Sequence, residues 1–379
     1  MQNFSLRYLL FSPNRILRMI CLGILFHPLI LSANEQLDIP LDIRNEYAPT
    51  LLFLQPRATT PIALKKGQSR INANLSLIND IKNSRYNVER DIPYAYQKPI
   101  LREYFLRYSG TYQEAGLMAD YYRFGHLNRQ YQTVIDMEYT VSRVQFDYGI
   151  SDSFELGIGF TGYSFNTGIL DSTINTYHSI MGVRTGKENL PDNEFKYLIT
   201  GTRSRIIQSK PHSGLGDTLL SGKWNFYNDG SGFSLALVGI VKLATGKSSL
   251  AMGSGKTDGS LGISMKYRSN RLVQFLNLNG IYVSNPFLND TIRARSYGMA
   301  SYGIGYNWTE DLSLMIQLDI HSSPYSSQTL LLSQPSAIFS CGFNLKVLES
   351  SLWQLGLMED ITFPVPDITF FSNWKTVFD

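Results

Sequence analysis

The feature that most constrains this chain is a regular alternation of apolar and polar residues in long runs. In residues 312–321 every even-numbered position is Leu or Ile, whereas the odd-numbered ones are Ser313, Met315, Gln317, Asp319 and His321. A period of two places successive side chains on opposite faces of a β-strand. Residues 69–79, 215–227, 257–268 and 336–347 repeat the pattern. We therefore expect an all-β protein whose strands carry one apolar and one polar face.

The length of these runs favours a membrane barrel over a soluble sheet. A soluble β-sandwich also alternates, but its strands usually have about 5–6 residues. The runs here have about 11–13 residues, which reaches the ~9–11 that a tilted strand needs to cross a bilayer. Aromatic residues gather near the run ends, among them Tyr227, Tyr267, Trp308, Trp353 and Trp374. Such placement is typical of the interfacial girdles of outer-membrane barrels.

Very short connections alternate with long ones along the chain. Ser151-Asp152 and Ser269-Asn270 are turn pairs, whereas segments 80–137 and 166–214 are long. Transmembrane barrels have short periplasmic turns and longer external loops. Threading the chain on this rule predicts an up-and-down antiparallel barrel with strands near 69–79, 138–149, 153–164, 215–227, 231–244, 257–268, 271–284, 296–308, 311–321, 336–347, 351–362 and 367–377.

The predicted number of strands is twelve, an even number that returns both chain ends to the periplasmic side. Residues 195–208 alternate as well. They either raise the number to fourteen or form a hairpin arm in an external loop. Residues 231–244 and 271–284 alternate poorly, and Val238 and Ile240 fall on the expected inner face.

The N-terminus has the pattern of an export signal. Three arginines precede an apolar run at 19–31, no acidic residue occurs before Glu35, and Ser32-Ala33 offers small residues for cleavage. We predict a signal peptide at 1–33 and a barrel at 68–379. Residues 34–67 contain four prolines and little alternation. We interpret them as a periplasmic or inward-folded segment, and the sequence leaves open whether they plug the barrel.

Charge and cysteine content narrow the partners. The chain has 34 Lys and Arg against 31 Asp and Glu. Without the three signal arginines, 31 basic and 31 acidic residues remain. This neutral balance does not favour binding to nucleic acid. Only Cys341 would remain after cleavage, which excludes an internal disulfide and a cysteine-based metal site. No cofactor or metal is expected.

The expected inner face carries charges of both signs. The lumen-facing candidates are Arg70, Arg143, Asp147, Glu155, Asp217, Lys223, Asp258, Lys266, Arg268, Asp319, His321, Lys346 and Lys375. In a narrow barrel such residues form ion-pair networks that fill the lumen, or they line a water path. Both arrangements stay open at this point.

Two loop motifs are further candidates. Gly253 and Gly255 stand in a stretch that is superficially similar to a phosphate-binding loop, but position 250 is Leu where the G-x-x-x-x-G-K-[ST] motif requires Gly. We interpret it as a flexible external loop. Tyr177 and His178 fall in a predicted short amphipathic helix within segment 166–214. That helix either packs over the barrel rim or constricts a pore.

Asp319, His321 and Ser322 would supply the residue types of a lipid hydrolase. A nucleophile needs its base within hydrogen-bond reach. The alternation places Ser322 on the opposite face from His321, so we expect a structural cluster and no enzyme.

Several segments together resemble a known family. They are Pro40–Asn45, Gly168–Asp171, Tyr177-His178, Gly214–Asp217, Leu243–Lys247, Gly253–Asp258, Asp319–Tyr325 and Pro366–Phe370. Over about residues 38–375 the chain resembles a family of outer-membrane proteins known only as a domain of unknown function. That family is similar to barrels named after a meta-pathway of phenol degradation. The resemblance implies an outer-membrane barrel, and the relatives' name implies passage of small hydrophobic or aromatic compounds.

The sequence thus predicts an outer-membrane channel for a small hydrophobic or amphipathic solute, gated by the loops at 80–137 and 166–214. Its expected partners are outer-membrane lipids, lipopolysaccharide and, during folding, the barrel-assembly machinery. Two alternatives stay open. One is a lipid-modifying hydrolase that uses His321, and the other is a closed structural or surface-interaction barrel.

Overall fold

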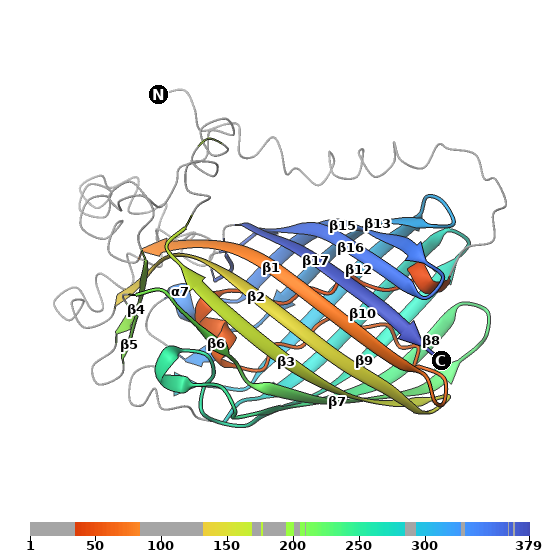
Figure 1. Cartoon of the computed structure of the whole chain (residues 1–379), viewed down its shortest axis with the longest axis horizontal. Coiled ribbons are helices and arrows are strands. Elements are labelled where there is room, and N and C mark those ends of the chain that lie inside the picture. The colour runs from red at the N-terminus through yellow and green to blue at the C-terminus, as the bar shows by residue number, and fades with distance from the viewer. Residues whose placement is uncertain are drawn as a thin grey trace, which may run out of the picture. The chain divides into compact units, whose positions relative to one another are not determined.

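Twelve long antiparallel strands pair in a ring that closes on itself (Figure 1). The computed structural model describes residues 35–83, 132–168, 176, 195–200, 205–208, 210–284, 293–326, 330–362, 364–366 and 368–379. The ring strands are β1 (Ser69–Asn83), β2 (Gln132–Ser151), β3 (Phe154–Asn166), β7 (Thr218–Asn228), β8 (Phe233–Leu243), β9 (Asp258–Ser269), β10 (Leu272–Tyr282), β12 (Tyr297–Asn307), β13 (Leu312–His321), β15 (Ser336–Leu348), β16 (Ser351–Asp360) and β17 (Ile368–Phe378).

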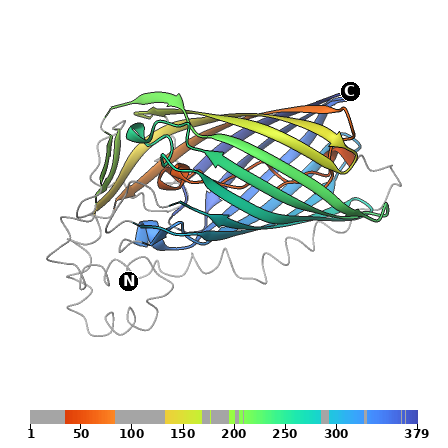
Figure 2. The same cartoon turned by 90° about the horizontal axis from the view of Figure 1, so that it is seen from below.

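Strands β1 and β17 close the ring, with Ser69 opposite Phe378 and Asn79 opposite Ile368. The all-β up-and-down barrel is therefore confirmed, and each predicted strand has its counterpart. The short turns and both ends of the barrel sequence lie at one end of the ring, which we call the turn end. The longer connections lie at the opposite end, the loop end (Figures 1 and 2).

Strands β1 and β2 extend well beyond their predicted ends at the loop end. Residues 80–83 and 132–137 were assigned to a loop, but they continue β1 and β2 because Asp80 pairs with Met137 and Asn83 with Val134. Residues 195–208 do not enter the ring. Strands β4 (Lys196–Thr200) and β5 (Arg205–Gln208) form a hairpin arm on the loop-end extension of β2, so the barrel has twelve strands and not fourteen.

Smaller elements complete the loop end. Strand β6 (His212–Leu215) pairs with the part of β3 beyond its contact with β7. Strands β11 (Arg293–Ala294) and β14 (Tyr325–Ser326) form a two-stranded sheet, followed by the short helix α7 (Leu330–Ser333). The 3-10 helices are η1 (Glu35–Leu37), η2 (Ala48–Leu52) and η3 (Ser248–Leu250). No helix in the described ranges is long and apolar enough to cross a membrane.

The outer face of the ring is an apolar belt. Leu75, Ile158, Ile263, Ile316 and Leu355 are aliphatic side chains exposed there. Large aromatic side chains border the belt at the turn end: Tyr148, Trp224, Tyr267, Trp308 and Trp374. Tyr282, Phe339 and Phe370 lie toward the loop end. An apolar band between aromatic girdles is the surface that a barrel presents to lipid.

The inner face explains the strands that alternate poorly. Val273 and Phe275 on β10 point inward and pack in a buried apolar cluster with Leu41 and Ile43 of the N-terminal segment. Phe371 of β17 is also buried in this cluster. The inward apolar residues therefore mark where the lumen is filled by protein.

The turns follow local chemistry. Asn270 takes the left-handed conformation with φ of 54°, which Asn tolerates better than most residues. Asp229 accepts hydrogen bonds from the Ser231 hydroxyl and from the backbone N–H groups of Ser231, Phe233 and Gly232. These bonds favour the charged form and lower the pKa of the Asp229 carboxyl below its ordinary value.

The apolar belt gives a test of the membrane assignment. Ile316 lies at the centre of β13 with an outward side chain. Ile316→Arg should reduce the free energy of unfolding in lipid vesicles by ~2–4 kcal/mol, the cost of a cation near the bilayer midplane. Denaturant titration of the refolded protein measures it. Glu310→Arg in the exposed turn before β13 is the control, and equal effects of the two changes would contradict the assignment.

Candidate functional site: the barrel lumen

An extended N-terminal hairpin occupies the lumen (Figures 1 and 2). We call residues 38–66 the lumen hairpin. Nearly all of its residues up to Ala58 are buried, and none of its residues belongs to a strand. Its backbone N–H and C=O groups therefore need partners other than a neighbouring strand, because a buried unpaired backbone group is costly.

The first limb runs from the turn end toward the loop end. Asp38 accepts hydrogen bonds from Arg268 at 2.9 Å and from Asn307 at 3.1 Å, both near turns. The backbone N–H of Leu41 donates to Gln317 Oε1 at 3.1 Å. Farther on, Asn45 donates to Ser336 Oγ at 3.1 Å, at the loop end of β15.

The apex of the lumen hairpin is the 3-10 helix η2. Tyr325 in the loop-end sheet donates its hydroxyl to the Pro49 carbonyl at 2.6 Å. Lys242 Nζ donates to the Leu52 carbonyl at 2.8 Å, and the Leu54 N–H donates to Asp258 at 3.0 Å. Around these contacts lies a buried apolar cluster that includes aromatic residues of the hairpin, strands and loops: Tyr47, Phe53, Tyr139, Tyr163, Phe165, Tyr197, Tyr297 and Tyr325.

The second limb returns to the turn end. The Thr59 N–H donates to Asn277 Oδ1 at 3.1 Å, and Lys223 donates to the Thr60 carbonyl at 3.2 Å. The Leu64 N–H donates to Glu155 at 2.8 Å. At the exit, the Lys66 N–H donates to Asp152 in the turn after β2 at 3.0 Å. Side chains of the wall thus provide the partners that a strand would otherwise supply.

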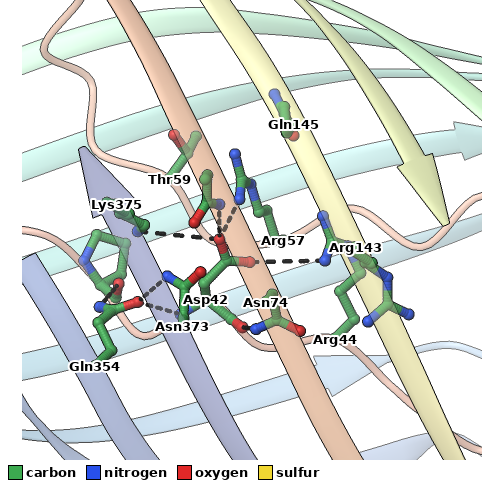
Figure 3. Close-up of polar contacts among 12 residues, drawn as sticks. Asp42, Arg44, Arg57, Thr59, Asn74, Arg143, Gln145, Gln354, Asn373 and Lys375 are labelled. Carbon is green, nitrogen blue, oxygen red and sulfur yellow. Dashed lines mark hydrogen bonds and ion pairs between the residues drawn. The ribbon is translucent and has the colours of Figure 1, made fainter. Parts of the chain in front are cut away.

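Asp42 is the centre of a cluster of charged side chains in the lumen (Figure 3). Its carboxylate forms a close ion pair with Arg57 of the opposite limb. Arg44 lies 3.6 Å from it and Lys375 of β17 lies 3.9 Å from it. Asn72 on β1 donates to the same carboxylate at 2.5 Å. Asp42 therefore connects both limbs of the lumen hairpin to the wall.

Two more acidic residues of the first limb bind wall cations. Glu46 accepts a two-pronged pair of hydrogen bonds from Arg143 on β2, at 2.6 and 2.8 Å. Such bidentate geometry is the strongest form of a guanidinium–carboxylate contact. Asp38 pairs with Arg268 at 2.9 Å and with Lys266 at 3.9 Å, both on β9.

Other ion pairs join wall residues to each other. Arg70 pairs with Asp147 at 2.8 Å and with Glu155 at 2.9 Å. Lys223 also pairs with Glu155, at 2.9 Å. These wall pairs hold together β1, β2, β3 and β7 on the side of the lumen near the turn end.

Lys242 binds two carboxylates near the loop end, Asp217 at 2.9 Å and Asp258 at 3.0 Å. Asp217 also accepts the backbone N–H of Gly246 at 2.7 Å. The glycine-rich loop is therefore folded inward and does not extend freely. A Cβ at Gly253 would stand 2.6 Å from the Asp217 carboxylate, so a larger residue there would displace Asp217. Gly255 is exposed, and its φ of 68° is a left-handed conformation that favours glycine.

The hydrolase candidate does not assemble. His321 is buried, and neither of its ring nitrogens has a hydrogen-bond partner among the described residues. Asp319 accepts hydrogen bonds from Gln317. Ser322 is exposed and donates to the Gly298 carbonyl. The nucleophile, base and acid therefore form no relay, because the alternation separates Ser322 from His321.

The remaining candidates take other places. Lys346 bonds with Glu349 at 2.8 Å beside the turn after β15, away from the lumen hairpin. Tyr177 and His178, with the predicted helix around them, lie outside the described residues. Among the described residues no group of three His, Cys, Asp or Glu side chains could hold a metal ion.

Sequence reasoning missed the hairpin side of the site. It did not single out Asp38, Asp42 or Glu46, nor their partner Arg57 or the wall residue Lys242. A signal was present, because the three acidic residues recur every four positions in a segment without alternation.

A family model described as "Protein of unknown function (DUF3187)" matches residues 113–375. The chain belongs to the DUF3187 family. This confirms the domain-of-unknown-function resemblance, whereas the similarity to the phenol-pathway barrels stays a prediction. No curated protein matches the chain.

Among solved structures, the chain is similar to the COG4313 outer membrane channel from Pseudomonas putida F1. The two are 12% identical with a TM-score of 0.51, over 84% of this chain and 97% of that one. The toluene transporter TodX of P. putida is 10% identical with a TM-score of 0.34, over 83% and 89%. TbuX, the toluene transporter of Ralstonia pickettii, is 8% identical with a TM-score of 0.37, over 83% and 90%. Only the first likeness bears on this DUF3187 member, and it shows the fold alone.

Lys242 should be essential to the loop end of the lumen. Lys242→Met would leave Asp217 and Asp258 buried without their shared cation, at a cost of about 3–5 kcal/mol. The measurement is the midpoint of urea unfolding in lipid vesicles. Lys256→Met, an exposed position in the same loop, should change stability by less than ~0.5 kcal/mol. Similar midpoints for the two variants would contradict the role given to Lys242.

Proposed function

We propose that this protein is an outer-membrane channel for a small amphipathic solute, closed by the lumen hairpin in the conformation described. The observation that carries the proposal is how the hairpin is held. It fills the lumen but forms no strand, and its contacts with the wall are side-chain hydrogen bonds, ion pairs and two apolar clusters. Its displacement would leave the backbone pairing of all twelve ring strands unchanged.

The lining of the lumen supports an amphipathic solute. The loop end offers the aromatic side chains that surround Tyr47 and Phe53. The middle and the turn end offer charged and amide side chains beside the second apolar cluster, which includes Leu41 and Ile43. A solute with an apolar body and a polar group would meet a matching surface along this path. The P. putida protein with the same fold is itself described as an outer membrane channel. The resemblance to phenol-pathway barrels implies small hydrophobic or aromatic compounds, which agrees with the apolar body of the proposed solute.

The proposal includes the cellular setting. Cleavage after Ala33 would free a mature chain whose first described residues lie at the turn end, the periplasmic side in barrels of this class. Residues 34–67 then form the lumen segment and residues 68–379 the barrel. Lipopolysaccharide, outer-membrane lipid and the assembly machinery are the partners that such a barrel would meet. The moving part in this proposal is the lumen hairpin, in place of the loops at 80–137 and 166–214.

A disulfide tether tests the gate. Asn45 of the lumen hairpin lies at hydrogen-bond distance from Ser336 of β15. We expect the full chain carrying N45C and S336C, with Cys341→Ser to avoid mispairing, to show discrete conductance steps in a planar bilayer when reduced. The oxidised protein should be silent, because the tether holds the hairpin against the wall.

The same protein in its two redox states is the matched control, and heat-modifiable gel mobility verifies the fold in both. Equal conductance with and without the tether would show that the hairpin is not the gate. A reduced protein that is folded and never conducts would overturn the channel and favour a closed structural barrel.

The hydrolase alternative has a separate test. Unmodified protein and His321→Ala should both show no ester hydrolysis with a fluorogenic phospholipid, because Ser322 and His321 do not meet. Hydrolysis by the unmodified protein that the substitution abolishes would contradict the channel proposal.

A further inference from the structure

The cations of the lumen wall fall into two groups by the origin of their carboxylate partners. Arg70, Lys223 and Lys242 pair with carboxylates of the wall itself. Arg143, Lys266, Arg268 and Lys375 pair with carboxylates of the lumen hairpin. Displacement of the hairpin would leave the first group compensated, whereas the second group would lose the partners described here.

The second group forms a track along the lumen. Lys266 and Arg268 lie near the turn end of β9, Lys375 lies three residues before the end of β17, and Arg143 lies eight residues before the end of β2. Their partners Asp38, Asp42 and Glu46 follow in the same order along the first limb. The carboxylates of the first limb thus pair with wall cations that lie progressively farther from the turn end.

The charged side chains of this track are buried, so they need partners of opposite charge. Glu46 and Arg143 are 2% and 8% exposed, and a buried charge without a partner is strongly unfavourable. The track therefore needs anionic groups whenever it is shielded from bulk water. In the closed conformation the lumen hairpin supplies them.

We propose that the solute is a small organic anion, and that Asp38, Asp42 and Glu46 occupy the positions that its carboxylate takes when the hairpin is displaced. This inference rests on the proposed channel function and names its substrate class. Asp38, Asp42 and Glu46 thus compete with the solute for the same wall cations. A carboxylate solute would neutralise the cations of the track when the hairpin is displaced.

The surroundings of Arg143 suit a carboxylate with an apolar body. A hollow beside it is lined by Asn72, Asn74 and the apolar Leu219 of the wall, which stay in place when Arg44 and Arg57 leave with the lumen hairpin. Guanidinium and amide N–H groups are the donors that a carboxylate prefers. Leu219 also packs against the apolar loop-end cluster, so donors and apolar surface adjoin at this point of the track.

The test is chemical rescue in the full chain. Glu46→Ala removes the carboxylate that pairs with Arg143 and leaves the room that a small carboxylate needs. We expect a lower midpoint of thermal unfolding, which heat-modifiable gel mobility measures. Added sodium acetate should restore about half of that shift at saturation, because a ligand that binds the folded state raises its stability. Acetamide, the neutral analogue, should restore none.

Two controls separate this effect from a general effect of salt. The double variant Glu46→Ala/Arg143→Gln has the same room but lacks the cation and should not respond to acetate beyond the unmodified protein. Asp217→Ala also removes one lumen carboxylate and opens space, but Lys242 keeps Asp258, so it should not respond either. Should Glu46→Ala fail to fold, Asp38→Ala provides the same test at Arg268 and Lys266.

An equal acetate response in the single and double variants, or none in the single variant, would overturn the inference. Conductance without rescue would retain the channel and refute the anionic solute. Rescue in a protein that never conducts would support the anion site and refute the channel.

Discussion

The structure depends on one constraint, the need of a buried backbone for hydrogen-bond partners. The lumen hairpin enters the barrel as extended chain, without the neighbour that a strand would have. Wall side chains such as Asn277, Gln317 and Lys242 take that place and bond its N–H and C=O groups one by one. The polar inner face of this barrel therefore supplies hydrogen-bond partners to one specific segment, the lumen hairpin, and does not serve only to contact water.

The same constraint shows what the sequence could predict. Lipid contact determines which residues lie on the outer face, because it requires an apolar side chain at every second position of each strand. Most ring strands could be predicted on that ground, whereas β8 and β10, which alternate poorly, could be placed only from the short and long connections around them. Strand ends were less certain where pairing continues beyond the membrane, as in β1 and β2, since no lipid requirement marks where such an extension stops.

The lumen was predictable only in part. Alternation shows that Arg143 or Asp258 points inward, but it cannot show which partner each one meets across the lumen. The partner of Arg143 is 97 residues away in the sequence, in a segment without periodicity. The poor alternation of β10 was the informative signal, because Val273 and Phe275 face Leu41 and Ile43. Inward apolar residues in a membrane barrel are best explained by protein inside it.

Both ends of the lumen hairpin lie at the same end of the barrel. Asp38 is held beside the turns near Arg268, and Lys66 is held at the turn after β2, just before β1 begins. The filling is thus a loop inserted from one side, and no chain end has to pass through the ring. The ring and its filling can form in successive steps, and the segment stays covalently attached to β1 whether it is inside or outside. In topological terms the lumen is filled by a loop that enters and leaves through one end, and not by a chain that passes through the ring.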